Sequence, residues 1–387
     1  MKYLLVIDHI ATGGAERILI DYYHHLIKSG HKVSVFVLTG KNGESFWSEG
    51  LQITYGSQND VNNLILKTKQ QIQLYFKLKK TVKHQKPDII FSFLEKSNLL
   101  SLAVPSKAQK IVTVHNVLSI QYQKIKRTTI RKIVYFLIRK AYNHCNNVIA
   151  VSQQVKSDLV NTLKIKKENI TVINNFVDPE FIQEKAKEKP DNFEFKENKK
   201  YLINIGRFSD QKAQWKLIKA YSISKSIQDK WELIIMGHGE YKNNLITLTK
   251  DLGLQKKVHI LPFSPNPYQY LEKANLIVLS SLFEGFPIVL AEASSLRVPF
   301  IGSEKAIPEE MFDHHDFWKT CIFKIETFDA NFTTEIQEDE KKLSQLIIRF
   351  TENEQDRKRI LEDTQIWEEH NNKSYQFQLY DQMVIKR

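Results

Sequence analysis

The amino-acid sequence predicts an α/β protein with two domains, each built on a parallel β-sheet. Short, β-rich apolar runs alternate with longer helical patterns along the chain, which is typical of parallel sheets whose strands are joined by helices. A length of 387 residues also exceeds what one compact core usually holds. The alternation is interrupted once, by a charged and apolar-poor stretch at residues 184–200, and then begins again.

The first half of the chain contains six expected strands. Several are continuous apolar runs, as expected of strands that helices cover on both faces. They are residues 3–7, 32–38, 88–93, 110–114, 148–151 and 170–173. Residues 15–29 have the period of a helix, and Gly30 stands where a C-terminal cap belongs. The apolar face of this helix would contain Ile18, Leu19, Tyr22, Leu26 and Ile27.

The second half repeats the pattern after the charged stretch. Its expected strands are residues 201–205, 231–236, 258–261, 276–279 and 299–301. The expected N-terminal domain is therefore 1–185 and the expected C-terminal domain is 186–370, with a cleft between them. Residues 371–387 hold a helical pattern that can cross back to the first domain.

Composition narrows the class of protein. Hydrophobic residues make up 42% and charged residues 26%, as in ordinary folded domains. Cys145 and Cys321 are too few for a disulfide framework and badly spaced for a zinc site, which favours a reducing compartment. The apolar N-terminus stops at Asp8 without a cleavage signal, and no apolar run reaches the roughly 20 residues that cross a bilayer. We therefore expect a soluble or peripheral protein.

The charge is positive and unevenly distributed. Lys and Arg number 56 and Asp and Glu 44, a net charge of +12, which indicates phosphate-bearing partners. Residues 61–87 contain seven lysines and no acid. Residues 124–140 combine basic side chains with an apolar helical pattern, as membrane-surface helices do. An anionic membrane is the favoured interpretation, and a solvated helix face and nucleic acid are the alternatives, although no nucleic-acid motif accompanies the charge.

Three motifs follow expected strands, where parallel sheets bind ligands. Gly13 and Gly14 lie before the first helix, where paired glycines let backbone approach a ligand or simply form a tight turn. Gly206, Arg207 and Lys212 follow the first strand of the second domain, and the two cations can converge on one anion. Gly237 follows the next strand and can line the same pocket.

The third motif joins two carboxylates to a helix start. Glu292 lies in a mostly apolar helix expected at residues 288–296, after the strand at residues 276–279, and Glu284 lies on the loop before that helix. Carboxylates are seldom buried without partners, and they suit the hydroxyl donors of a sugar. The free N–H groups at the helix start suit phosphate oxygens. A capping carboxylate with a structural ion pair is the alternative interpretation.

In order along the chain, these motifs resemble those of the retaining glycosyltransferases of family 4. That family has the GT-B fold, two Rossmann-like, doubly wound α/β domains facing a cleft. Its Glu-x7-Glu motif matches Glu284 and Glu292, its Gly-Arg…Lys motif matches Gly206, Arg207 and Lys212, and its Gly-Gly loop matches Gly13 and Gly14. The segment Thr113-Val114-His115-Asn116 resembles the one that holds the family's donor-sugar histidine.

The resemblance implies a role for each matched residue. Arg207 and Lys212 would hold the donor diphosphate and neutralise it as it leaves. Glu292 would accept from the ribose hydroxyls, Glu284 from the donor sugar, and His115 would sit beside the transferred sugar. Gly14 would approach the diphosphate or the acceptor. The backbone of the helix-start loop would contact sugar and phosphate, through Gly285, Phe286, Pro287, Ile288 and Val289.

The resemblance implies metal-independent transfer with retention at the anomeric carbon. The chain contains no Asp-x-Asp pair, the usual metal holder of the other glycosyltransferase fold, and no residue stands out as a covalent nucleophile. We therefore expect front-face transfer in which donors aimed at the developing charge supply the largest catalytic term. No cofactor and no metal site are expected.

The expected function is a hexosyltransferase that needs a nucleotide-sugar donor. It would move a hexose or N-acetylhexosamine, from UDP if the family's commonest nucleotide applies, to a lipid-linked or surface-glycan acceptor. The expected location is cytoplasmic and peripheral on the inner face of the cell membrane, within polysaccharide biosynthesis of the cell envelope. Two alternatives are a non-catalytic GT-B partner subunit, which would show eroded donor residues, and a nucleotide-sugar epimerase, which would lack this Glu-x7-Glu combined with Arg207 and Lys212.

Overall fold

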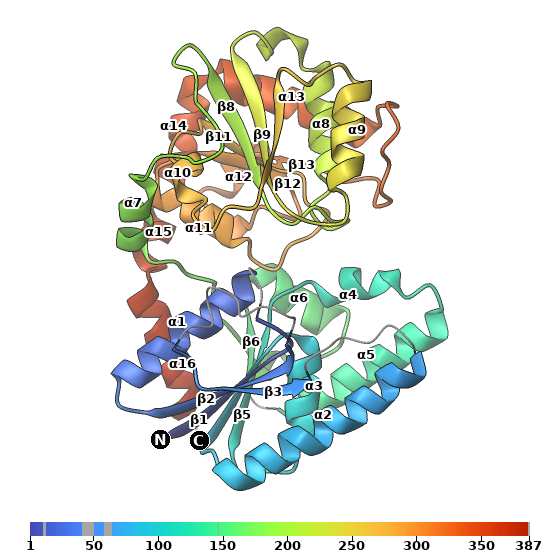
Figure 1. Ribbon diagram of the computed structural model, residues 1–387, viewed down its shortest axis with the longest axis vertical. Coiled ribbons are helices and arrows are strands. Elements are labelled where there is room, and N and C mark those ends of the chain that lie inside the picture. Colours follow the sequence, from blue (N-terminus) through green and yellow to red (C-terminus); the bar gives the residue numbers. More distant parts are fainter. Residues whose placement is uncertain (11–12, 41–49, 58–63, 146, 386–387) are drawn as a thin grey trace. The chain divides into compact units, whose positions relative to one another are not determined.

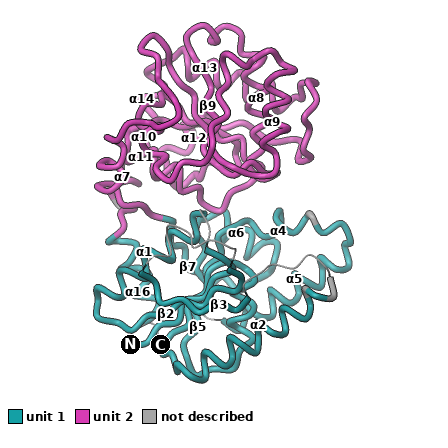
Figure 2. Tube along the Cα trace, viewed as in Figure 1, with its two compact units in different colours: residues 1–175, 374–387 teal, residues 176–373 magenta. Residues whose placement is uncertain are grey.

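The chain folds into two compact α/β units. The computed structural model describes residues 1–387 except 11–12, 41–49, 58–63, 146 and 386–387. Unit 1 consists of residues 1–175 and 374–387, and unit 2 of residues 176–373 (Figure 2). Each unit contains one parallel sheet with helices on both faces (Figure 1), which confirms the predicted fold class.

The sheet of unit 1 has seven strands in the order β3-β2-β1-β4-β5-β6-β7, and all pairs are parallel. The six predicted strands are confirmed, and β3 was missed. It is an edge strand in which only Gly56 is buried, so it lacks the apolar run of an inner strand. The strands are β1 (Lys2–Ile7), β2 (Lys32–Thr39), β3 (Ile53–Ser57), β4 (Ile89–Phe93), β5 (Gln109–Val114), β6 (Val148–Ala150) and β7 (Ile170–Val172).

The helices of unit 1 follow the predicted alternation. They are α1 (Gly14–Lys28), α2 (Leu64–Gln85), α3 (Glu95–Ala103), α4 (Leu118–Gln121), α5 (Thr128–Asn143), α6 (Gln153–Asn161) and α16 (Lys373–Ile385), with short 3₁₀ turns at Tyr122–Lys124 and Lys167–Asn169. Gly30 caps α1 at φ +79°, and its N–H donates to the carbonyl of Ile27. The predicted apolar face is buried except at Ile27, which is 45% exposed because it lies at the helix end, beside solvent. Among the described residues, no helix combines the length and apolar character needed to cross a bilayer.

The C-terminal helix α16 packs on unit 1 beside α1, although the two helices lie at opposite ends of the sequence (Figure 1). The fully buried ring of Tyr380 lies 5.1 Å from that of Tyr22 in α1 and 5.5 Å from that of Phe91 in β4. Asp381 accepts hydrogen bonds from the Tyr22 hydroxyl at 3.2 Å and from Nε2 of His25 at 3.0 Å. Aromatic packing and the hydrogen bonds of Asp381 therefore attach the C-terminal helix to α1 and β4 of unit 1.

The sheet of unit 2 has six strands in the order β10-β9-β8-β11-β12-β13, again all parallel. The strands are β8 (Lys200–Ile205), β9 (Trp231–Gly237), β10 (Val258–Pro262), β11 (Leu276–Leu279), β12 (Phe300–Ser303) and β13 (Ile322–Phe323). The helices are α7 (Pro179–Ala186), α8 (Gln214–Ile223), α9 (Lys242–Asp251), α10 (Tyr268–Leu271), α11 (Ile288–Ser295), α12 (His315–Thr320), α13 (Glu338–Glu352), α14 (Glu354–Asp363) and α15 (Gln365–His370), with 3₁₀ turns at Lys225–Ile227 and Glu309–Met311.

The boundary between the units differs from the one read from the sequence. Unit 2 begins at Phe176, ten residues before the predicted start at 186, because α7 packs against α10 and α11. The side chain of Gln183 in α7 donates to the carbonyl of Ser295 at 3.1 Å. The charged stretch is also fixed to unit 2, since Nζ of Lys196 lies 2.9 Å from Oε1 of Glu232. A polar composition therefore marked a surface segment of unit 2 and not the hinge.

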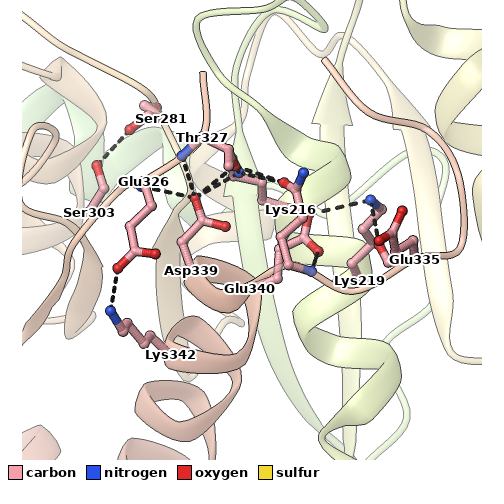
Figure 3. Close-up of polar contacts among 11 residues, drawn as sticks. Lys216, Lys219, Ser281, Ser303, Glu326, Thr327, Glu335, Asp339, Glu340 and Lys342 are labelled. Atoms are coloured by element: carbon pink, nitrogen blue, oxygen red, sulfur yellow. Dashed lines mark hydrogen bonds and ion pairs between the residues drawn. The ribbon is translucent and has the colours of Figure 1, made fainter. Parts of the chain in front are cut away.

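Two ion pairs join α8 to the start of α13 inside unit 2 (Figure 3). Lys216 and Asp339 are fully buried, with Nζ 2.8 Å from Oδ2. Asp339 also accepts from the backbone N–H groups of Glu326 and Thr327, both at 3.2 Å. Next to them, Nζ of Lys219 donates to the carbonyl of Glu335 at 2.9 Å and lies 3.4 Å from Glu340. The fold thus holds four buried charges in pairs, as a low-dielectric interior requires.

Candidate active site

The predicted donor motifs of unit 2 converge at one edge of its sheet. Residues 206–212 follow β8, residues 237–239 begin at the last residue of β9, and residues 284–287 lie between β11 and α11. Because β9, β8 and β11 are adjacent parallel strands, the loops that follow them share the carboxyl edge. This is where open α/β sheets bind ligands.

Two glycines of this edge are required by close backbone packing. A Cβ on Gly237 would lie 2.0 Å from the carbonyl oxygen of Gly206, and the φ of Gly237 is +155°. A Cβ on Gly239 would lie 2.3 Å from the carbonyl oxygen of Phe208. The N–H of Phe208 donates to the carbonyl of His238 at 2.7 Å, which fastens the two loops together. Gly237 thus shapes the site by letting the β8 and β9 loops touch.

The structure brings Lys212 and Glu284 into direct contact. Nζ of Lys212 lies 2.6 Å from Oε1 of Glu284, and Glu284 is only 6% exposed. The side chain of Gln211 donates to Oε2 of Glu284 at 3.2 Å and to the carbonyl of Phe283 at 3.1 Å. The carboxylate is therefore held on both oxygens, while the Lys212 ammonium keeps two further N–H groups for another acceptor.

Arg207 lies on the same loop with its side chain exposed. Among the described residues its guanidinium has no ion-pair partner. Its carbonyl oxygen accepts from the side chain of Gln214 at 3.1 Å, which fixes the backbone beneath it. The loop then turns into α8 through Ala213, whose left-handed φ of +46° is uncommon for a residue with a Cβ. The loop backbone is therefore fixed, and it carries two cations, Arg207 without an ion-pair partner among the described residues and Lys212 paired with Glu284.

Glu292 lies one turn inside α11 and is 8% exposed. The hydroxyl of Tyr268 donates to its Oε1 at 3.2 Å. The start of α11 at Pro287 has no side-chain cap, so its first N–H groups carry the partial positive charge of a helix N-terminus. Phe286 is stacked on Trp367 at 5.5 Å, which holds the segment Gly285, Phe286, Pro287, Ile288 and Val289 against α15.

In unit 1, Gly13 and Gly14 form the turn that enters α1. A Cβ on Gly13 would lie 2.3 Å from Oε2 of Glu16, so the buried Glu16 side chain occupies the space that any larger residue would need. Oε1 of Glu16 lies 3.3 Å from Nε2 of His9. Gly14 is exposed at the helix start. Packing against Glu16 thus explains the glycine at position 13, and the exposed Gly14 leaves its backbone accessible to a ligand.

His115 follows β5 and is 7% exposed. Its Nε2 lies 2.9 Å from the hydroxyl of Thr113, which itself donates to the carbonyl of Ser92 at 3.0 Å. Since that hydroxyl has one proton, Nε2 of His115 carries the hydrogen and Nδ1 is the acceptor nitrogen. Burial lowers the pKa of His115 to about 3, so the ring is neutral at physiological pH. Nδ1 has no partner among the described residues.

Sequence reasoning missed three contributors to these arrangements. Gln211 stands between the matched Arg207 and Lys212, so its place in the motif was a usable signal. Glu16 follows Gly13 by three residues, the spacing of one helical turn. Tyr268 lies 24 residues from Glu292 and gave no sequence signal.

Two models of glycosyltransferase families match the chain, one over each half. The model of "Glycosyltransferase Family 4" matches residues 12–181, and that of "Glycosyl transferases group 1" matches residues 185–367. The chain is 29% identical over 314 residues to an uncharacterized glycosyltransferase of Methanocaldococcus jannaschii, covering 73% of this chain and 76% of the other.

A characterised relative and a solved structure extend the comparison. The N-acetylgalactosamine-N,N'-diacetylbacillosaminyl-diphospho-undecaprenol 4-alpha-N-acetylgalactosaminyltransferase of Campylobacter jejuni is 27% identical over 328 residues, covering 82% of this chain and 84% of its own. The crystal structure of Anabaena Alr3699/HepE in complex with UDP and glucose has a TM-score of 0.76 at 17% identity and covers all of both chains. Together, the two family models and this shared architecture show that the chain belongs to the GT-B glycosyltransferases.

Proposed function

We propose that this glycosyltransferase moves a hexose or N-acetylhexosamine, with retention, from a UDP-sugar to a lipid-linked acceptor. The observation that carries the proposal is the contact between Lys212 and Glu284 at the carboxyl edge of unit 2. It joins a cation suited to phosphate with a carboxylate suited to sugar hydroxyls. UDP is chosen because HepE, of the same fold, binds UDP and glucose.

The donor diphosphate would bind to Arg207 and Lys212. Cleaving the sugar–phosphate bond leaves negative charge on the departing diphosphate, and preorganised cations stabilise that charge. Lys212 offers the N–H groups that Glu284 does not use, and Arg207 offers an unpaired fork. The uncapped start of α11 would add backbone N–H groups to the phosphate.

The sugar and the ribose would bind to carboxylates. Glu284 would accept from hydroxyls of the donor sugar, and Glu292 from the ribose. His115 would accept a hydroxyl hydrogen at Nδ1, since its other nitrogen is committed to Thr113. The backbone would approach the donor closely at four glycines, Gly13, Gly14, Gly206 and Gly237. Retention and independence of metal are part of the proposal, by family resemblance.

A lipid-linked acceptor is proposed from the relatives. The Campylobacter transferase named above acts on a diphospho-undecaprenol substrate, and an Escherichia coli relative, 27% identical over 249 residues, is a UDP-Gal:alpha-D-GlcNAc-diphosphoundecaprenol alpha-1,3-galactosyltransferase. Such lipids lie in a membrane, so the enzyme would work as a peripheral protein at the inner membrane face.

Unit 1 offers a surface for that membrane on α2 and α5, both of which contact α3. Each helix presents large apolar side chains to solvent next to lysines or arginines, the composition of an interfacial helix. The exposed apolar residues are Leu66, Ile72 and Phe76 on α2 and Ile130, Ile133, Phe136 and Leu137 on α5. Phe136 is 61% exposed, which is costly for a phenyl ring in water and favourable in lipid.

The transferase proposal is tested by nucleotide release from a panel of UDP- and GDP-sugars. Wild-type protein should release nucleotide from one donor. Glu284→Ala should lower that rate about 10²–10³-fold, the usual effect of removing one group that stabilises the transition state. Silence across the panel, without a thermal shift from UDP or GDP, would instead support the non-catalytic partner subunit.

The membrane proposal is tested by flotation with phosphatidylcholine vesicles, with and without phosphatidylglycerol. The wild type should float with the anionic vesicles, because each basic residue near such a surface contributes on the order of 1 kcal/mol. The double variant Ile133→Ser, Phe136→Ser should float less. The matched control Ile246→Ser, which changes an exposed apolar residue of α9, should float like the wild type. Equal flotation of all three proteins would rule this surface out.

A further inference from the structure

Glu95 is a buried acid at the carboxyl edge of the unit 1 sheet to which no motif assigns a role. It is 6% exposed, and its Oε1 has no hydrogen-bond partner among the described residues. It opens α3 directly after Leu94, whose φ of +74° is strained for a residue with a Cβ. A buried carboxyl oxygen without a partner is costly, so the arrangement needs an explanation beyond packing.

A second unsatisfied atom lies at the same sheet edge. Phe93 of β4 pairs with Thr113 of β5 in parallel register, so Glu95 and His115 both stand two residues past that pair. The ring of His115 is stacked on that of Phe93 at 6.0 Å. Its Nδ1 is a buried acceptor without a partner among the described residues. The residues that follow two adjacent strands, Glu95 after β4 and His115 after β5, therefore each carry a buried polar atom without a hydrogen-bond partner among the described residues.

The groups that face Glu95 keep it uncharged. Burial, and then the negative charge of Asp8, raise the pKa of Glu95 to about 8. Asp8 itself accepts from the backbone and hydroxyl of Ser97 at 2.8 and 2.6 Å. The hydroxyls of Tyr122 and Tyr142 also lie in the field of Glu95, and each has a raised pKa, first by burial and then by the charge of Glu95. Glu95 therefore presents one O–H donor and one acceptor at neutral pH.

We propose that Glu95 binds the acceptor sugar, with its free carboxyl oxygen hydrogen-bonded to an uncharged hydroxyl or acetamido group of that sugar. This inference rests on the proposed function. A sugar is favoured over phosphate because Asp8 would repel an anion, whereas an uncharged acid, with one O–H donor and one acceptor oxygen, matches hydroxyl and amide groups. Glu95 shares the sheet edge of His115, which is proposed beside the transferred sugar, and the acceptor must lie next to that sugar for the new bond to form. The acceptor is therefore favoured, because the donor's diphosphate and ribose are assigned to Arg207, Lys212 and Glu292 of unit 2.

The test measures transfer from the UDP-sugar that the donor panel identifies to undecaprenyl-diphosphate-linked N-acetylgalactosamine, together with hydrolysis of the donor without that acceptor. Glu95→Ala should raise the KM for the acceptor about tenfold, the usual effect of leaving one buried polar group unpaired. Donor hydrolysis should not change. Glu95→Gln, whose amide keeps N–H donors and an acceptor oxygen in the same place, should retain the wild-type KM at pH 7.

The pH dependence separates binding from a structural role. Below pH 8 Glu95 is protonated and keeps the O–H group that can donate to the sugar. The wild-type KM for the acceptor should therefore rise as pH increases through about 8, because ionisation removes that donor. Glu95→Gln should show no such rise, and the control Glu340→Gln, a buried acid of unit 2, should keep it. An unchanged acceptor KM in Glu95→Ala, or an alkaline rise that persists in Glu95→Gln, overturns the inference. A wild type that is inactive with every donor would overturn the proposed function instead.

Discussion

Lys212→Ala is expected to lower turnover by about 10²–10³-fold, the cost of removing one preorganised group from a charge-stabilising site. Its ammonium would neutralise the departing diphosphate, and no second lysine follows β8 before α8 begins. The KM for the donor should change less than turnover, because the charge that Lys212 meets is largest in the transition state. Steady-state kinetics with the donor found in the panel would measure both.

The pairing of Lys212 with Glu284 requires a control. Removing Lys212 leaves the buried Glu284 carboxylate with Gln211 as its remaining described side-chain donor, so lost activity could reflect a disturbed loop. In Lys212→Ala, Glu284→Gln that uncompensated charge is gone, and Glu284→Gln alone is the reference because Glu284 is itself proposed to contact the donor sugar. If the double variant turns over as fast as Glu284→Gln, Lys212 only neutralises Glu284. If it is much slower than Glu284→Gln while the melting temperature recovers, Lys212 acts on the donor.

Lys216→Met is expected to destabilise the fold by about 3–5 kcal/mol, because it leaves the fully buried Asp339 without its cation. Unfolding by urea, followed by tryptophan fluorescence, would measure the loss. Lys216→Met, Asp339→Asn should regain much of it, since the asparagine oxygen can still accept from Glu326 and Thr327. A single variant within 1 kcal/mol of the wild type, or a double variant less stable than the single one, would contradict this account.

The same pair gives stability a defined pH dependence. Burial alone would raise the pKa of Asp339, but the hydrogen bond and charge of Lys216 and the backbone donors outweigh it and lower that pKa. The stabilisation is therefore complete above the unfolded-state value of about 3.9 and is lost as pH falls through the lower folded value. The difference between the wild type and Lys216→Met should shrink in acid.

The motifs identified the loops that the structure brings to one edge of the unit 2 sheet, because loops and strand ends are local in sequence. Gly206, Arg207 and Lys212 lie within seven residues, and Glu284 and Glu292 within nine. The contact between Lys212 and Glu284 spans 72 residues and was not predicted. It depends on β8 and β11 being neighbours in the sheet, which no local pattern encodes.

The sequence by itself determined the two-domain α/β class, the strands that are buried on both faces and the helix that ends at Gly30. These features follow from apolar runs, helical periodicity and a left-handed cap, all of which act over a few residues. The tertiary structure decided that β3 forms an edge strand, that α7 and the charged stretch belong to unit 2, and that α16 packs on unit 1. It also decided which charges are buried together, as in Lys216 with Asp339, and that Glu95 and His115 share a sheet edge. Those outcomes depend on packing between segments far apart in the chain, because burial and partner choice are properties of the assembled core.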